Sequence, residues 1–196
     1  MRPLLVLEDT TRPRWRLFRV LGVEWWATRW AWVSPLFWVG LGYGVAWGDP
    51  AGGGSGAARL ATAGLVYGLL LYLTNTAHTL GHIAAARLAR TPMDAVVLTS
   101  TRDVNVYRGP KREVAERVRV VRSLGGPLAN AVVGAVCLGA GLGLADGSIT
   151  AVTPVGWLRM FGVFNVCIAA WTLAPVPTMD GWIVWRWIFR RGGSRA

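Results

Sequence analysis

Charged residues are absent from four long stretches of the chain, and this absence is the dominant pattern in the sequence. The stretches are 30–48, 60–86, 123–145 and 160–179, with 19, 27, 23 and 20 residues. A helix needs about 20 apolar residues to cross the hydrocarbon core of a bilayer. Buried helices of a soluble bundle would carry a polar face at helical spacing, and these stretches have none. The pattern therefore predicts helices that cross a membrane.

We expect an all-α polytopic membrane protein with about four transmembrane helices. The expected spans are about 30–48, 60–87, 123–145 and 155–174, followed by a short broken segment at 180–189. Pro175 and Pro177 separate the last two, because proline interrupts a helix. We expect the whole chain, residues 1–196, to form a single integral membrane domain.

The longest polar segment, 91–122, has two short runs rich in β-branched residues in its middle. These runs cover residues 96–99 and 104–107. Such runs, bounded by turn residues, are typical of strands joined as a hairpin. We therefore expect a small cytoplasmic β-hairpin in this segment.

Basic residues alternate along the chain in a way that orients the spans. The chain has 21 Lys and Arg against 10 acidic residues, a formal charge of +11. Only Arg59, between the first two spans, and Arg159, near the start of the fourth, fall elsewhere; the other 19 precede the first span, lie in 87–122 or follow residue 185. Because cytoplasmic loops carry an excess of Lys and Arg, we expect both termini and segment 87–122 to be cytoplasmic. The expected location is a prokaryotic plasma membrane.

The composition excludes a soluble nucleic-acid-binding protein in spite of the basic balance. Apolar residues make up 53% of the chain and charged residues only 16%, whereas soluble domains average about 25% charged. We therefore expect the lipid bilayer as a partner, and no nucleic acid.

Both histidines of the chain lie in the second expected span. His78 and His82 are four residues apart, so on a helix they share one face about one turn apart. This spacing allows two imidazoles to bind one zinc ion, and it also suits a packed or hydrogen-bonded pair. Ionisable groups within a membrane are costly and mark functional sites, which favours the metal-binding interpretation.

Asp180 is the one acidic residue embedded in apolar sequence with no loop around it. The charge alternation places it at about the same depth as the two histidines. Two histidines and one carboxylate would give three ligands and leave one position open, as in a catalytic zinc site. The alternative is a carboxylate that caps a short terminal helix.

Three motifs in the chain resemble those of the site-2 protease family of intramembrane zinc metalloproteases. They are H-x-x-G-H at 78–82, S-L-G-G-P-L-A-N at 123–130 and N-V-C-I-A-A-W-T-L-A-P-V-P-T-M-D-G at 165–181. The resemblance implies a zinc ion (Zn²⁺) held by three ligands, with two polar residues nearby. The implied ligands are His78, His82 and Asp180, and the implied polar residues are Asn130 and Asn165.

The chain departs from the family pattern at the residue after His78. The family motif is H-E-x-x-H, in which the Glu is the general base, and Thr79 occupies that position here. A threonine hydroxyl does not ionise near neutral pH, so Thr79 is not expected to act as a base. Two further departures are Thr172, where the family has Asn, and Trp182, where it has Gly.

Three functional hypotheses remain open. The first is a pseudoprotease that keeps the zinc site and binds transmembrane segments or a membrane-anchored partner without cleaving them. The second is an active intramembrane zinc metalloprotease that cleaves membrane-anchored proteins with an unconventional base, such as Glu24, Asp94 or Asp103. The third is a metal-free membrane interaction scaffold. Because the ligands are retained and the base is lost, the sequence favours the first hypothesis. The resemblance also implies that segment 96–107 presents an extended segment of the bound polypeptide.

Overall fold

The computed structural model describes residues 13, 15–48, 56–100, 103–107, 114–144 and 153–192. Most of the expected external loop at 48–56 lies outside these residues, as do the first twelve residues and the last four. The chain divides into two compact units. One unit comprises residues 1–34, 79–127 and 171–196, and the other comprises 35–78 and 128–170. A single membrane domain formed from both units stays a prediction.

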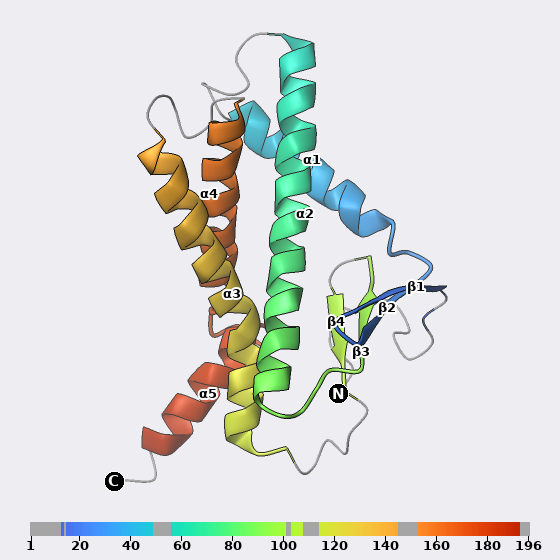
Figure 1. The fold of residues 1–196 in the computed structure, drawn as a ribbon, viewed down its shortest axis with the longest axis vertical. Coiled ribbons are helices and arrows are strands. Elements are labelled where there is room, and N and C mark those ends of the chain that lie inside the picture. Colours follow the sequence, from blue (N-terminus) through green and yellow to red (C-terminus); the bar gives the residue numbers. More distant parts are fainter. Residues whose placement is uncertain are drawn as a thin grey trace. The chain divides into compact units, whose positions relative to one another are not determined.

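Five helices make up most of the described chain (Figure 1). They are α1 (Val33–Gly48), α2 (Ala57–Leu88), α3 (Glu116–Gly143), α4 (Pro154–Thr172) and α5 (Asp180–Gly192). Three of them, α2, α3 and α4, are long and apolar enough to cross a membrane. This supports an integral membrane protein with three of the roughly four expected spans.

The first expected span is shorter than the sequence predicts. Helix α1 has 16 residues, which extend about 24 Å at 1.5 Å per residue, against a hydrocarbon core of about 30 Å. The apolar stretch begins at Trp30, but residues 29–32 form turns, and the amide of Val33 donates to the carbonyl of Trp30. The helix therefore loses three residues at its start.

The predicted predominance of helices is confirmed, but the described chain also contains a four-stranded sheet where the sequence predicts a single hairpin. The strands are β1 (Trp15–Val20), β2 (Val23–Ala27), β3 (Ala95–Leu98) and β4 (Asp103–Val106), in the spatial order β1-β2-β3-β4. Strands β3 and β4 are antiparallel and form the expected hairpin. Strands β1 and β2 form a second hairpin, and β2 pairs with β3 in parallel.

The hairpin of β1 and β2 turns at Leu21 and Gly22, both of which have positive φ, 50° and 72°. Two-residue turns with positive φ match the twist of paired strands, and Asn-Gly or Asp-Gly is their usual sequence. A leucine in the left-handed region is uncommon, and for this reason the turn gave no signal in the sequence.

The sheet packs against the C-terminal part of α2 (Figure 1). Val23 and Trp25 from β2, Val96 from β3, and Ile83 and Ala86 from α2 belong to one buried apolar cluster. Burial of these side chains from water or headgroups favours the packed arrangement. As a result, β3 and β4 are held beside the helix that carries both histidines.

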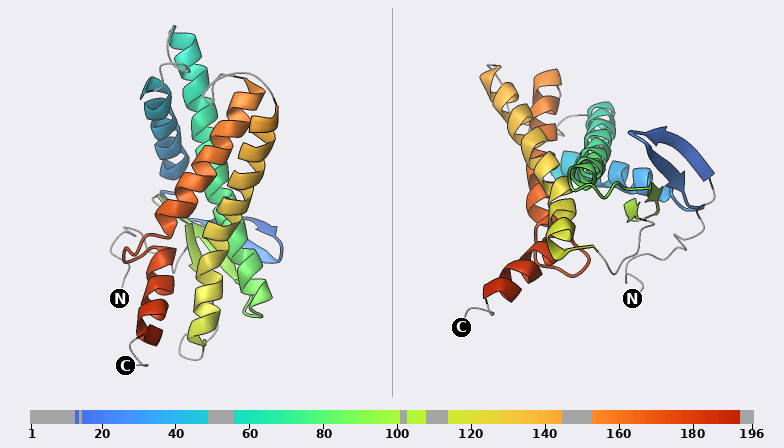
Figure 2. Two further views of the ribbon diagram at one scale, coloured as in Figure 1. Left: turned by 90° about the vertical axis from the view of Figure 1, so that its left-hand side faces the viewer. Right: turned by 60° about the horizontal axis from the view of Figure 1, so that its bottom comes forward.

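Helices α3 and α4 run side by side in both views of Figure 2, and glycines lie where they approach each other. A Cβ atom at Gly134 would collide with the side chain of Val166, and one at Gly162 would collide with Leu138. Small residues allow membrane helices to pack with their backbones close together.

Arg159 joins these two helices through hydrogen bonds. Its side chain is buried, with Nε donating to the carbonyl of Gly141 (2.7 Å) and Nη2 donating to the carbonyl of Leu144 (2.9 Å). The last carbonyls of a helix have no partners within the helix, so this guanidinium caps the C-terminal end of α3.

We expect Arg159→Ala to destabilise the protein by about 1–3 kcal/mol, because the carbonyls that accept from Arg159 would lose a charged donor in an apolar environment. The measurement is thermal unfolding of the purified protein in detergent. Arg117→Ala is the matched control, since Arg117 is exposed in the first turn of α3. Equal unfolding temperatures for the two variants would contradict the capping role.

Candidate metal centre

Helix α2 carries His78 and His82 one turn apart, and the fold brings Asp180 to them. One ligand atom from each of the three residues lies within 4.8 Å of the other two. Nε2 of His82 and Oδ2 of Asp180 are 3.3 Å apart. The three residues predicted as ligands are therefore together, and such a group could hold a metal ion.

The ring of His82 is oriented by the backbone of α3. Its Nδ1 lies 2.8 Å from the carbonyl oxygen of Arg122, which can only accept a hydrogen bond. Nδ1 of His82 therefore carries a proton and donates this hydrogen bond, which in the neutral ring leaves the lone pair of Nε2 for a metal ion shared with Asp180. Metal-binding histidines are commonly held in this way, with the second ring nitrogen donating to a carbonyl.

His78 has a comparable partner in Asn130. Nδ1 of His78 lies 3.4 Å from the side-chain amide of Asn130, which is fully buried. Within the described part of the chain, Oδ1 of Asn130 has no hydrogen-bond partner. A half-turn of the amide would let Oδ1 accept a hydrogen bond from the N–H at Nδ1 of His78, which leaves Nε2 for a metal ion. The buried amide oxygen therefore fits a metal site.

Asp180 is held at the start of α5 by Ser123. The Ser123 hydroxyl lies 2.9 Å from the carbonyl oxygen of Asp180 and 3.3 Å from its Oδ1. The next residue must be small, since a Cβ atom at Gly181 would collide with the backbone of Leu173. Asp180 does begin a short helix, as the capping alternative requires, but its carboxylate contacts His82 and Ser123.

Thr79 points to a carboxylate on the sheet. Thr79 is 2% exposed, and its hydroxyl donates to Oδ2 of Asp103, the first residue of β4, at 3.0 Å. Of the other two acidic residues considered as bases, Glu24 lies in β2 and pairs with Arg16 at 3.2 Å. Asp94 precedes β3 and donates its amide proton to the end of β4. Asp103 therefore places a carboxylate beside the residue that follows His78.

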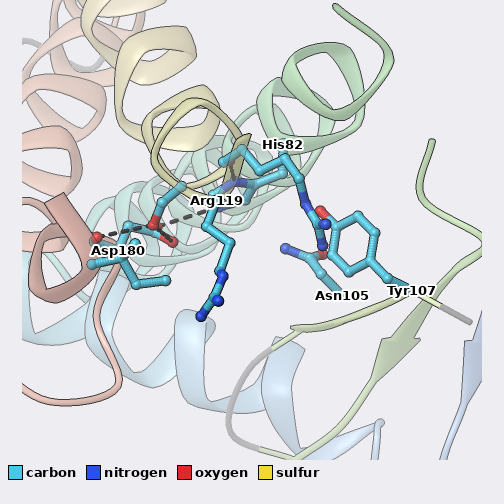
Figure 3. A pocket seen from close by; sticks show the side chains of 8 residues that line it. His82, Asn105, Tyr107, Arg119 and Asp180 are labelled. Carbon is cyan, nitrogen blue, oxygen red and sulfur yellow. Dashed lines mark hydrogen bonds and ion pairs between the residues drawn. The ribbon is translucent and has the colours of Figure 1, made fainter. Parts of the chain in front are cut away.

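A cavity of about 200 Å³ adjoins the candidate ligands (Figure 3). His82 and Asp180 form one part of its wall, and Asn105 and Tyr107 of the β4 region form another. Arg119 and Arg122 contribute positive charge from α3. The cavity can therefore receive a polar group directly beside the metal centre.

Tyr107 and Arg122 are in close contact in this wall. The guanidinium carbon of Arg122 lies 3.1 Å from the centre of the Tyr107 ring. Burial raises the pKa of the Tyr107 phenol above its usual value, and the charge of Arg122 offsets part of this effect. The phenol is therefore neutral at physiological pH and can donate a hydrogen bond.

Asn165 lies one turn away from the histidine pair. Its amide donates to the hydroxyl of Thr74 (3.1 Å) and to the carbonyl of Phe161 (2.8 Å). Thr74 precedes His78 by one helical turn on α2. A role of Asn165 in the site stays a prediction.

Sequence reasoning missed several residues that surround the centre. Ser123 opens the 123–130 motif but has no predicted role, and neither does Arg119, whereas Asn105 and Tyr107 fall within segment 96–107 without a role of their own. Asp103 and Asn105 are two apart in one strand and share one of its faces, which is a signal that could have grouped them.

The fold and the site together define a membrane protein with a site-2-protease-like fold and a possible His-His-Asp metal site. The solved structure that shows this likeness is the site-2 protease from Methanocaldococcus jannaschii, with a TM-score of 0.59 and 19% sequence identity. The match covers 90% of this chain and 72% of that one. No protein-family model and no curated protein matches the sequence. At 19% sequence identity, this similarity is evidence about the fold alone.

We expect Asn130→Leu to lower zinc affinity by about 10–100-fold, because His78 would lose the partner that orients its ring. The measurement is zinc competition against a chelator with the purified protein. Asn165→Leu is the control, since it removes an equally buried amide that bonds Thr74 instead. Unchanged affinity in Asn130→Leu would show that this contact does not orient a ligand.

Proposed function

We propose that the protein is a zinc-binding membrane protein that holds an extended segment of a membrane-anchored polypeptide beside its metal centre. The observation that carries this proposal is the cluster of His78, His82 and Asp180. Both histidines have a hydrogen-bond partner at their second ring nitrogen, as metal ligands usually do.

Zinc suits this donor set better than other common ions. Imidazole nitrogen and carboxylate oxygen are frequent zinc ligands, and three protein ligands with one open position are typical of reactive zinc sites. When bound, zinc would supply a Lewis acid that can polarise a carbonyl group of the bound chain. Cleavage would require a proton acceptor in addition, and α2 has Thr79 where the family has Glu. The residues of α2 alone therefore support binding, as in a pseudoprotease.

The sheet offers a place for an extended partner segment. Strand β4 is the last strand in the order β1-β2-β3-β4, so within the described residues one edge of β4 has no neighbouring strand. An extended polypeptide can add to such an edge through its backbone hydrogen bonds. The buried Oδ1 of Asn105 has no partner in the described part of the chain and could accept one more hydrogen bond in the cavity.

We expect one zinc ion per chain in the purified protein, and we expect Asp180→Ala to weaken zinc binding strongly because it removes one of three ligands. Metal analysis after dialysis measures this directly. Asp94→Ala serves as a control with the same loss of charge at a carboxylate outside the cluster. Full zinc content in Asp180→Ala would show that Asp180 only begins α5. A wild-type protein that binds no zinc would instead support the hypothesis of a metal-free interaction scaffold.

We also propose that the start of α3 is cytoplasmic and the start of α2 external, which follows from the distribution of basic residues. In a protein whose Cys137 and Cys167 are replaced by Ser, single cysteines at the exposed positions 59 and 117 report the two sides. A membrane-impermeant thiol reagent added to intact cells should label position 59 only. Labelling of position 117 from outside would overturn this orientation.

A further inference from the structure

We propose that Asp103 supplies the metal centre with the carboxylate that α2 lacks, and that Thr79 is its positioning residue, so that the protein hydrolyses a peptide bond in the segment it binds. The inference adds a reaction to the binding function, and it rests on the same metal centre. Its origin is the hydrogen bond of 3.0 Å between the Thr79 hydroxyl and Oδ2 of Asp103.

The contact occurs at the one position where a base is missing. Thr79 directly follows the candidate ligand His78, and its side chain is 2% exposed. A hydrogen bond from a hydroxyl to a carboxylate is charge-assisted and therefore strong and short. Thr79 and Asp103 together thus place a carboxylate beside this position of α2. The family motif places a carboxylate there with a single glutamate.

Strand β4 directs Asp103 to the same region as the cavity. Residues two apart in a strand share one face, so Asp103 and Asn105 lie on one side of β4. Asn105 lines the cavity together with His82 and Asp180 (Figure 3). Asp103 therefore lies on the face of β4 that carries a cavity residue.

The packing of the sheet holds this carboxylate in place. Asp103 pairs with Leu98 in the register of β3 and β4, and β3 contributes Val96 to the apolar cluster that includes Ile83 of α2. Functional groups on strands are positioned more accurately than groups on loops. The carboxylate is thus fixed relative to the helix that carries both histidines.

Hydrolysis uses Asp103 as a proton acceptor and then as a proton donor. The oxygen of a water molecule forms a bond to the peptide carbonyl carbon, and a proton of that water passes to the Asp103 carboxylate. The proton then passes to the amide nitrogen as the carbon–nitrogen bond breaks, which gives a carboxylic acid and an amine and returns Asp103 to its ionised form. Such general acid–base assistance typically contributes 10²–10⁴-fold in rate.

The contact between Thr79 and Asp103 also affects any attempt to introduce the family's glutamate at position 79. A glutamate introduced by Thr79→Glu alone would bring a second carboxylate against Asp103, and like charges at this distance repel each other. The double variant Thr79→Glu with Asp103→Thr exchanges the two groups and keeps one carboxylate and one hydroxyl. It is therefore the informative substitution at this position.

The first test is cleavage of a membrane-anchored model polypeptide by zinc-loaded full-length protein in lipid nanodiscs. We expect chelator-sensitive cleavage by the wild type, and a 10²–10⁴-fold loss of kcat in Asp103→Asn with unchanged zinc content. Asp94→Asn is the matched control and should retain kcat. Thr79→Ser should keep most of the activity, and Thr79→Val should lose much of it, because only serine can still donate to Asp103.

The second test does not depend on turnover. With Co²⁺ in place of zinc, Asp103→Asn should change the visible absorption spectrum, because a carboxylate next to the open ligand position would hydrogen-bond to a water there, whereas Asp94→Asn should not. The proposal would be overturned by full kcat in Asp103→Asn or by an unchanged Co²⁺ spectrum in that variant. It would also be overturned if the double variant Thr79→Glu with Asp103→Thr cleaved the polypeptide and the wild type did not. Failure of the binding function is separable, because it would appear as loss of zinc binding in the wild type.

Discussion

Polar groups in apolar helices need hydrogen-bond partners within the protein, because hydrocarbon provides none. This constraint organises the described structure. Arg159 meets the carbonyls at the end of α3, Asn130 meets His78, and Ser123 meets Asp180. Thr74 and Thr76 donate to carbonyls of α2 itself, whereas the buried hydroxyl of Thr79 donates to Asp103 of β4. The candidate metal centre is thus the place where several such partners converge.

The small sheet and the C-terminal part of α2 act together as a support for this centre. Their shared apolar cluster aligns β3 and β4 with the turn of α2 that follows His78. A site built only from membrane helices would present its ligands but no carboxylate at the position of Thr79. The β4 region adds Asp103 beside Thr79, and it adds Asn105 and Tyr107 to a cavity wall that is otherwise made of helical residues.

Sequence reasoning located the helices well because the absence of charge over about 20 residues is a direct consequence of the hydrocarbon environment. It also brought His78, His82 and Asp180 together, since helical spacing and charge alternation constrain depth. Strands β1 and β2 were missed because the Leu21-Gly22 turn has no typical turn signature. The Thr79–Asp103 contact depends on the register of a sheet formed by distant segments, which one sequence does not reveal.

The parallel pairing of β2 with β3 also carries an entropic cost. Parallel strands cannot be joined by a tight turn, and here α1 and α2 lie between them in the chain. Pairing of β2 with β3 therefore closes a loop that contains both helices, and the entropy of this closure opposes the pairing. The apolar cluster that the sheet shares with α2 offsets this cost. A substitution that weakens the cluster would therefore release β3 and β4 from α2 without touching any candidate metal ligand.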